Sequence, residues 1–112
     1  MECINPKELM AFIEKRLASV DLIDIRSQFE YDECHLPNAI SIPINSLKFI
    51  DYSSAKPIAV FYCNTSSRTF DNVDELTELG YKENYILLGG IGSWKRLLFP
   101  VCTRNKCRCL VE

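Results

Sequence analysis

The stretch IAVFYCNTSSR, residues 58–68, decides the fold of this chain. Residues 58–62 are the most apolar and most β-prone run in the sequence, as expected of the central strand of a buried sheet. A polar loop, residues 63–68, follows at once. From Thr69 to Leu79 the spacing is helical, and Gly80 supplies a C-terminal cap. The residues predicted to face the core are Phe70, Val73, Leu76 and Leu79.

Strands and helices alternate on both sides of this stretch. Upstream, Asn5 caps a predicted helix that begins at Pro6. Further predicted strands cover residues 21–26, 39–42 and 85–88, and shorter helical segments are expected at 29–34, near 45 and at 94–99. This alternation predicts an α/β fold with a mostly parallel central sheet flanked by helices on both faces.

Composition indicates one globular domain. The chain has 112 residues, of which 47% are hydrophobic and 25% charged, far from the profile of a disordered segment. We expect the domain to cover residues 1–100 and a basic, cysteine-rich tail to cover 101–112. The formal net charge of −2 disfavours binding to nucleic acid.

The six cysteines point to thiol chemistry or metal binding. The chain shows neither an export signal nor an apolar stretch that could span a bilayer, so we expect a cytoplasmic protein without a membrane partner. Disulfides are uncommon in that compartment. Three cysteines lie in the tail, namely Cys102, Cys107 and Cys109. Their spacing matches no common zinc site, so we expect no metal.

Cys63 is the predicted nucleophile. Ligands bind at the carboxyl ends of parallel strands, where helix N-termini present free backbone N–H groups. Cys63 falls at this place, followed by the amides of residues 64–68. Such amides and the positive end of a helix stabilise a thiolate, so we expect Cys63 to be ionised at neutral pH without a general base.

Three motifs of the sequence resemble the signatures of the rhodanese family. The first comprises Leu22-Ile23-Asp24-Ile25-Arg26, then Glu30-Tyr31 and His35-Leu36-Pro37-Asn38-Ala39-Ile40. The second is Tyr62-Cys63 with Arg68, and the third is Gly89-Gly90-Ile91-Gly92-Ser93-Trp94. The resemblance spans residues 4–98 and implies a rhodanese fold.

The resemblance implies a sulfurtransferase that needs no cofactor. Cys63 would take a sulfane sulfur from thiosulfate, a polysulfide or a persulfide, and pass it from the Cys63 persulfide to cyanide or a thiol, including a protein thiol. Phosphatases with a similar fold have the arginine six positions after the cysteine, whereas Arg68 lies five positions after it. The shorter loop resembles the sulfur-transferring branch.

The substrate-binding residues predicted from this loop are Asn64, Thr65, Ser66, Ser67 and Arg68. Asn64 and Ser66 stand where the family often has arginine and glycine, which makes the loop less basic and puts activity on thiosulfate in question. Arg68 has two open roles, as an anion ligand or as an ion-pair partner of Glu30.

Structural support is expected from Asp24, Arg26, Glu30 and His35. Asp24 and Arg26 would brace strand ends, and His35 has a structural role if the thiolate is preformed. Cys102, Cys107 or Cys109 could receive the sulfur of Cys63, although an idle tail is the simplest interpretation. Two alternatives to the enzyme remain: a non-catalytic rhodanese-like binding or regulatory module, and a phosphatase or arsenate-reductase-type enzyme. The sequence leaves the oligomeric state open.

Overall fold

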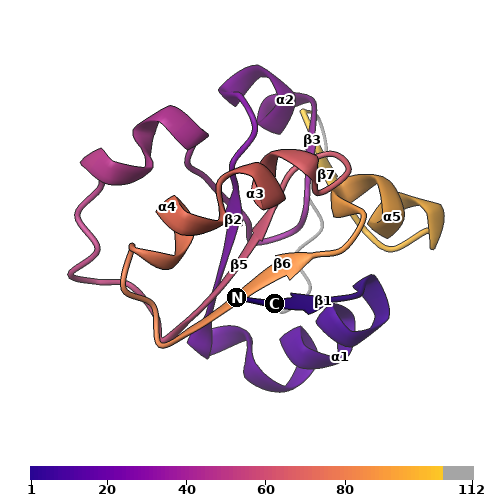
Figure 1. Cartoon of the computed structure of the whole chain (residues 1–112). Coiled ribbons are helices and arrows are strands. Elements are labelled where there is room, and N and C mark those ends of the chain that lie inside the picture. Colours follow the sequence, from indigo (N-terminus) through magenta and orange to yellow (C-terminus); the bar gives the residue numbers. More distant parts are fainter. Residues whose placement is uncertain (105–112) are drawn as a thin grey trace.

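A sheet of five parallel strands forms the centre of the molecule, in the order β1-β6-β5-β2-β4 (Figure 1). The computed structural model describes residues 1–104. Its strands are β1 (Glu2–Ile4), β2 (Val20–Asp24), β4 (Ile40–Ser41), β5 (Ile58–Tyr62) and β6 (Glu83–Leu87). The predicted parallel sheet is confirmed, and β5 lies at its centre.

Helices cover both faces of the sheet, as the alternating elements predict (Figure 1). On one face, Val60 and Tyr62 of β5 pack with α1 (Pro6–Arg16) and α5 (Gly90–Arg96). On the other, Ala59 and Phe61 pack with η2 (Ile44–Phe49) and α4 (Val73–Thr77). The remaining helices are η1 (Leu17–Ser19), α2 (Gln28–Glu33) and α3 (Ser67–Asp71). Since alternate side chains of a strand point to opposite faces, the all-apolar run of β5 serves both layers.

Local sequence signals set the boundaries of several elements. The Asn5 side chain accepts from the Glu8 backbone N–H at 2.8 Å and Glu8 reciprocates at 2.9 Å, which confirms the predicted start of α1. Asn38 has a φ of 68°, the left-handed conformation that asparagine tolerates. Trp94 of α5 is fully buried and donates to the Pro100 carbonyl oxygen at 2.8 Å, so it anchors the core.

The predicted helix over residues 69–79 is wrong in its continuity. The structure has two short helices, α3 and α4, separated at Asn72. The Asn72 side chain donates to the Arg68 carbonyl oxygen at 2.7 Å, in place of the backbone N–H of residue 72 that would continue an α-helix. Phe70, predicted to face the core, is 48% exposed.

Two other features depart from the prediction. The last helix, α5, spans Gly90–Arg96 and therefore begins before the predicted segment 94–99. A small antiparallel sheet joins β3 (Cys34–His35) to β7 (Cys102–Thr103). The first residues of the predicted tail thus pair with the domain, and Cys102 is fully buried.

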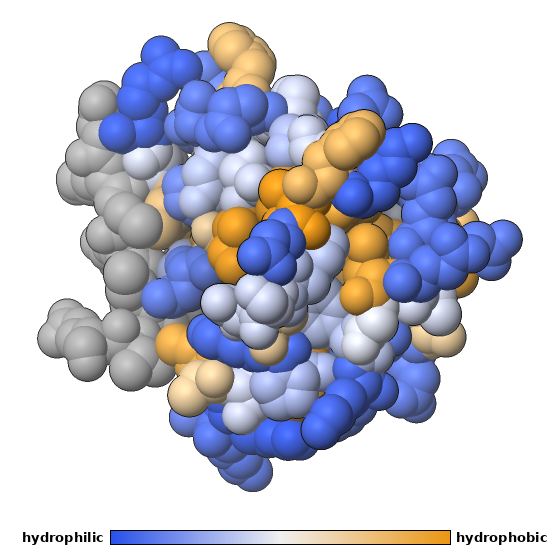
Figure 2. All heavy atoms as spheres, turned by 90° about the vertical axis from the view of Figure 1, so that its left-hand side faces the viewer, coloured by the Kyte–Doolittle hydropathy of each residue, from blue (hydrophilic) through white to orange (hydrophobic). Residues whose placement is uncertain are grey.

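The surface carries apolar side chains on the side of η2. Figure 2 shows this face, where orange apolar atoms lie near the middle among blue hydrophilic ones. Phe49 is 77% exposed there, and Ile50 lines a pocket of about 450 Å³ between η2 and the end of α4. Within residues 1–104, no helix is long and apolar enough to cross a membrane.

Candidate active site

Cys63 lies between the end of β5 at Tyr62 and the start of α3 at Ser67. Its exposure is 1%, and it belongs to the apolar cluster that contains Phe61. The Sγ atom is 3.9 Å from the Thr69 hydroxyl, which itself donates to the Ser66 carbonyl oxygen at 2.6 Å. The Thr69 side chain thus links the position of the sulfur to the Ser66 backbone.

The backbone carbonyl groups of the loop at Cys63 and Asn64 are held by α5. The backbone N–H groups of Ile91 and Gly92 donate to the carbonyl oxygens of Cys63 and Asn64 at 2.9 and 3.0 Å. Gly90 makes this approach possible, because a Cβ atom there would lie 2.2 Å from the Cys63 oxygen. Its φ of 56° also favours glycine. The third sequence motif therefore acts as a backbone support for the cysteine loop.

The backbone amides of the loop point away from acceptors in the described part of the chain. In the described part of the chain, none accepts a hydrogen bond from the backbone N–H of Asn64, Thr65 or Ser66. Ser66 has a φ of 79°, and its hydroxyl accepts from the Gly89 N–H at 3.2 Å. Unused amides beside a cysteine can bind an anion or a polarised sulfur.

A buried ion pair lies next to the loop. Arg26 and Asp24 are 5% and 0% exposed, and the Arg26 Nη2 atom donates to the Asp24 carboxylate at 2.6 Å. Arg26 also donates to the Cys34 carbonyl oxygen and, through Nη1, to the Asn64 Oδ1 atom at 3.1 Å. The pair therefore braces the end of β2 and holds the Asn64 side chain.

A second ion pair joins α2 to α3. Both guanidinium Nη atoms of Arg68 donate to the Glu30 carboxylate at 2.9 Å, in a two-pronged arrangement. These hydrogen bonds hold the pKa of Glu30 well below its usual range and raise the pKa of Arg68. Asn64 adds a hydrogen bond from Nδ2 to Glu30 Oε2 at 2.8 Å. The proposed ion-pair partner of Arg68 is thus the observed one, and Asn64 connects it to Arg26.

Tyr62 and a stacked pair of rings, His35 on Tyr31, stabilise the surroundings of the loop. Burial, assisted by the negative charge of Asp24, raises the pKa of Tyr62 well above its usual value, and its hydroxyl accepts from the Leu36 N–H at 3.1 Å. The His35 ring stacks on Tyr31 with centroids 3.8 Å apart, and His35 Nδ1 lies 2.8 Å from the Tyr31 carbonyl oxygen. These contacts fit the structural role expected for His35.

The family model for the rhodanese-like domain matches residues 5–97. The chain belongs to the rhodanese-like family. Thiosulfate sulfurtransferase GlpE of Coxiella burnetii is 32% identical over 96 residues, which cover 82% of this chain and 85% of that protein. "Adenylyltransferase and sulfurtransferase uba4" of Ogataea parapolymorpha is 32% identical over 81 residues, covering 70% of this chain but only 21% of that protein. These similarities support the assignment of this chain as a sulfurtransferase.

A solved structure supports the fold assignment. The rhodanese-like domain of Alr3790 from Anabaena sp. superposes with a TM-score of 0.77 at 22% identity, over 90% of this chain and 78% of that one. The identity is low, so this likeness bears on the rhodanese-like fold alone. It agrees with the parallel sheet and the helices on both of its faces.

The rhodanese-like domain brings most of the predicted site residues together. The network described above contains Cys63, Asn64, Ser66, Arg68, Asp24, Arg26 and Glu30. Thr65 and Ser67 are exposed and bond each other through their hydroxyls at 3.3 Å. The prediction did not assign roles to Thr69 or Gly90. The spacing of Gly89, Gly90 and Gly92 was the available signal for the second of these.

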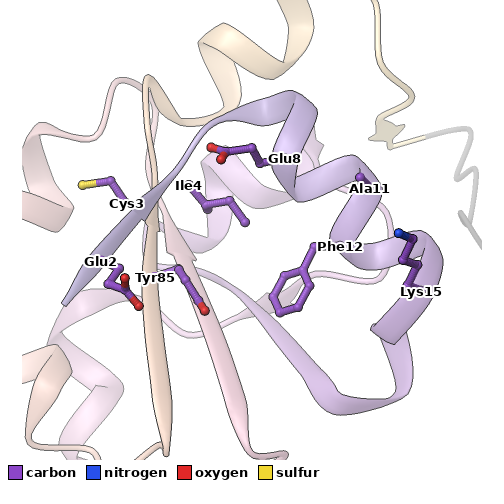
Figure 3. A pocket seen from close by; sticks show the side chains of 8 residues that line it. All are labelled: Glu2, Cys3, Ile4, Glu8, Ala11, Phe12, Lys15 and Tyr85. Carbon is purple, nitrogen blue, oxygen red and sulfur yellow. The ribbon is translucent and has the colours of Figure 1, made fainter.

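Other candidate groups lie apart from this loop. A pocket of about 520 Å³ lies between β1 and α1, where the rings of Phe12 and Tyr85 meet edge-to-face with their centroids 5.8 Å apart (Figure 3). No residue of 63–68 lines it. Residues 1–104 hold no group of three or more potential metal ligands from histidine, cysteine or acidic side chains. Cys102 is disulfide-bonded and hence not a free thiol, whereas the predictions for Cys107 and Cys109 lie outside the described residues.

Proposed function

We propose that this chain is a sulfurtransferase that carries sulfur as a persulfide on Cys63. The observation that carries the proposal is the position of Cys63, at the carboxyl end of the central parallel strand of a rhodanese-like domain. The backbone amides of residues 64–66, which follow Cys63 directly in the loop, make no hydrogen bond to residues 1–104. These groups can stabilise the negative charge of the thiolate and of the bound donor.

The reaction has two displacement steps. In the first, the Cys63 thiolate attacks the outer sulfur of thiosulfate, a polysulfide or a persulfide. A new S–S bond forms, the donor's S–S bond breaks, and its electron pair leaves with sulfite or a thiolate. In the second, cyanide, a small thiol or a protein thiol attacks the outer sulfur of the Cys63 persulfide, and the Cys63 thiolate is regenerated. No cofactor takes part.

Access to Cys63 requires movement of the loop. A donor sulfur has to come within about 3.5 Å of Sγ in a reactive geometry, yet Cys63 is only 1% exposed. The backbone of Cys63 and Asn64 is held by α5, so we assign the movement to residues 65–68. We place the reaction in the cytoplasm, where thiol acceptors remain reduced.

Intact-mass analysis tests the proposal. After incubation with thiosulfate, polysulfide or a small persulfide, the wild type should gain one sulfur atom that a thiol reductant removes, and Cys63→Ser should not. Cys3→Ser is the matched control, because Cys3 is a free, exposed thiol. An unchanged wild-type mass with every donor, or an equal gain in Cys63→Ser, would refute the enzyme.

That refuting result would favour the second candidate, a rhodanese-like module that binds a partner without catalysis. The burial of Cys63 is the observation on its side. The two candidates therefore differ in one measurable event, the transfer of sulfur to Cys63.

A further inference from the structure

Asn64 occupies a central position between the two ion pairs of the site. Its Oδ1 atom accepts from Arg26 at 3.1 Å, and its Nδ2 group donates to Glu30 at 2.8 Å. Arg26 is 5% exposed and held by Asp24, so it is a fixed anchor for the Asn64 amide. The orientation of this amide is therefore set from the buried side of the site.

Glu30 is held in turn from both of its oxygens. Oε1 accepts from the Ser27 backbone N–H at 3.1 Å, within the N-terminal cap of α2, and Oε2 accepts from Asn64. A carboxylate fixed in this way presents both oxygens to the guanidinium of Arg68, at 2.9 Å each. Arg68 is the cation of the cysteine loop, and its charge is balanced by Glu30 while this arrangement lasts.

We propose that Asn64 determines donor specificity by holding Glu30 against Arg68, which disfavours donors with two negative charges relative to donors with one. The inference rests on the proposed sulfur transfer at Cys63 and deepens it. Asn64 acts through Glu30 and is a positioning residue. Loop amides remain to bind a monoanionic donor, whereas a dianion also needs the positive charge that Glu30 neutralises.

Thiosulfate and methanethiosulfonate form a matched donor pair. Both present an outer sulfur bonded to an oxidised sulfur, and they carry charges of −2 and −1. Attack by the Cys63 thiolate forms one S–S bond and breaks another, and the electron pair leaves with sulfite or methanesulfinate. Both reactions conserve charge and follow the same displacement. The two donors therefore differ mainly in the net charge that the site must accommodate when the donor binds.

Glu30→Gln keeps the shape of the side chain and removes its charge. The Coulomb energy of removing one charge is twice as large for a dianion as for a monoanion, so a rate change of roughly threefold for the monoanion corresponds to roughly tenfold for the dianion. We therefore expect kcat/KM to rise by those factors for thiosulfate and methanethiosulfonate. Asn64→Ala should shift the donor ratio in the same direction by a smaller factor, and should shift it no further in the Glu30→Gln background.

Glu33→Gln is the control, since Glu33 lies on the same helix in an exposed pair with Arg104 at 3.1 Å and should leave the donor ratio unchanged. Equal changes for both donors in Glu30→Gln, or an Asn64→Ala effect that persists without the Glu30 charge, would overturn the inference. If sulfur is transferred but the ratio of kcat/KM for the two donors is unaltered in both variants, the inference is refuted and the proposed function stands. Absence of transfer from every donor in the wild type removes the proposed function as well.

Discussion

Replacement of Gly90 by alanine should separate α5 from the cysteine loop. The added Cβ would lie 2.2 Å from the Cys63 carbonyl oxygen and 2.7 Å from the Asn64 carbonyl carbon and oxygen. All three are backbone atoms, so no side-chain rotation relieves the contact. The two segments have to move apart, which weakens the hydrogen bonds from Ile91 and Gly92 to the loop.

The expected loss of stability is the sum of two terms. A positive φ costs an alanine about 1–2 kcal/mol, and two weakened backbone hydrogen bonds cost about 1 kcal/mol each. Gly90→Ala should thus lower the free energy of unfolding by about 3–4 kcal/mol. Each kcal/mol lost corresponds to a fall of roughly 4–8 °C in Tm. Persulfide formation on Cys63 should slow as well, because the loop loses its fixed side.

Gly80→Ala is the matched control. Gly80 also has a positive φ, of 92°, but an added Cβ there has no neighbour within 4 Å. This variant should show the backbone cost alone, about 1–2 kcal/mol, and normal persulfide formation. Urea denaturation and intact-mass kinetics on both variants give the comparison. Equal losses of stability in the two, or unaltered kinetics in Gly90→Ala, would show that the close contact does not support the loop.

Three further predictions concern the surroundings of the loop. Tyr62→Phe should lower the free energy of unfolding by about 1–3 kcal/mol in urea denaturation, because the buried Leu36 N–H loses its acceptor; an unchanged value would contradict this. Hydrogen bonds from Arg68 lower the pKa of Glu30, so ionised Glu30 adds to the free energy of unfolding at neutral pH. This contribution should decline as pH falls below about 4.5. Urea titrations of Glu30→Gln should lack this part of the decline. In thiol labelling followed by mass spectrometry, the rate at Cys63 should fall steeply as the reagent becomes bulkier, whereas exposed Cys3 should show little size dependence; equal size dependence would mean an open loop.

Elements encoded by local signals could be predicted from the sequence. The apolar run of β5 and the reciprocal cap of α1 depend on neighbouring residues, and both are found as expected. The break at Asn72 was missed because a helical apolar period continues through it. The periodicity does not show that its side chain competes for the Arg68 carbonyl.

Contacts between distant segments explain the remaining differences. Asn64 stands where the resemblance to the family implies an arginine, and the sequence alone showed only a loss of positive charge. Its bonds to Arg26 and Glu30 span 38 and 34 positions along the chain. The pairing of β3 with β7 involves two residues on each side, too few to give a strand pattern. Such features follow from the arrangement of the sheet, which has to be known first.

The two ion pairs of the site differ in the free energy that it costs to separate their charges. Breaking the pair of Arg26 with Asp24 leaves a buried charge without a partner, and such losses typically cost about 3–5 kcal/mol. The pair of Arg68 with Glu30 is 40% and 27% exposed, where water replaces the lost partner and the cost is small. Movement that uncovers Cys63 should therefore begin at Arg68, while Arg26 stays in place. The residue that meets an incoming donor first is then the same one whose charge Glu30 balances, so access to the sulfur and preference for donor charge depend on a single contact.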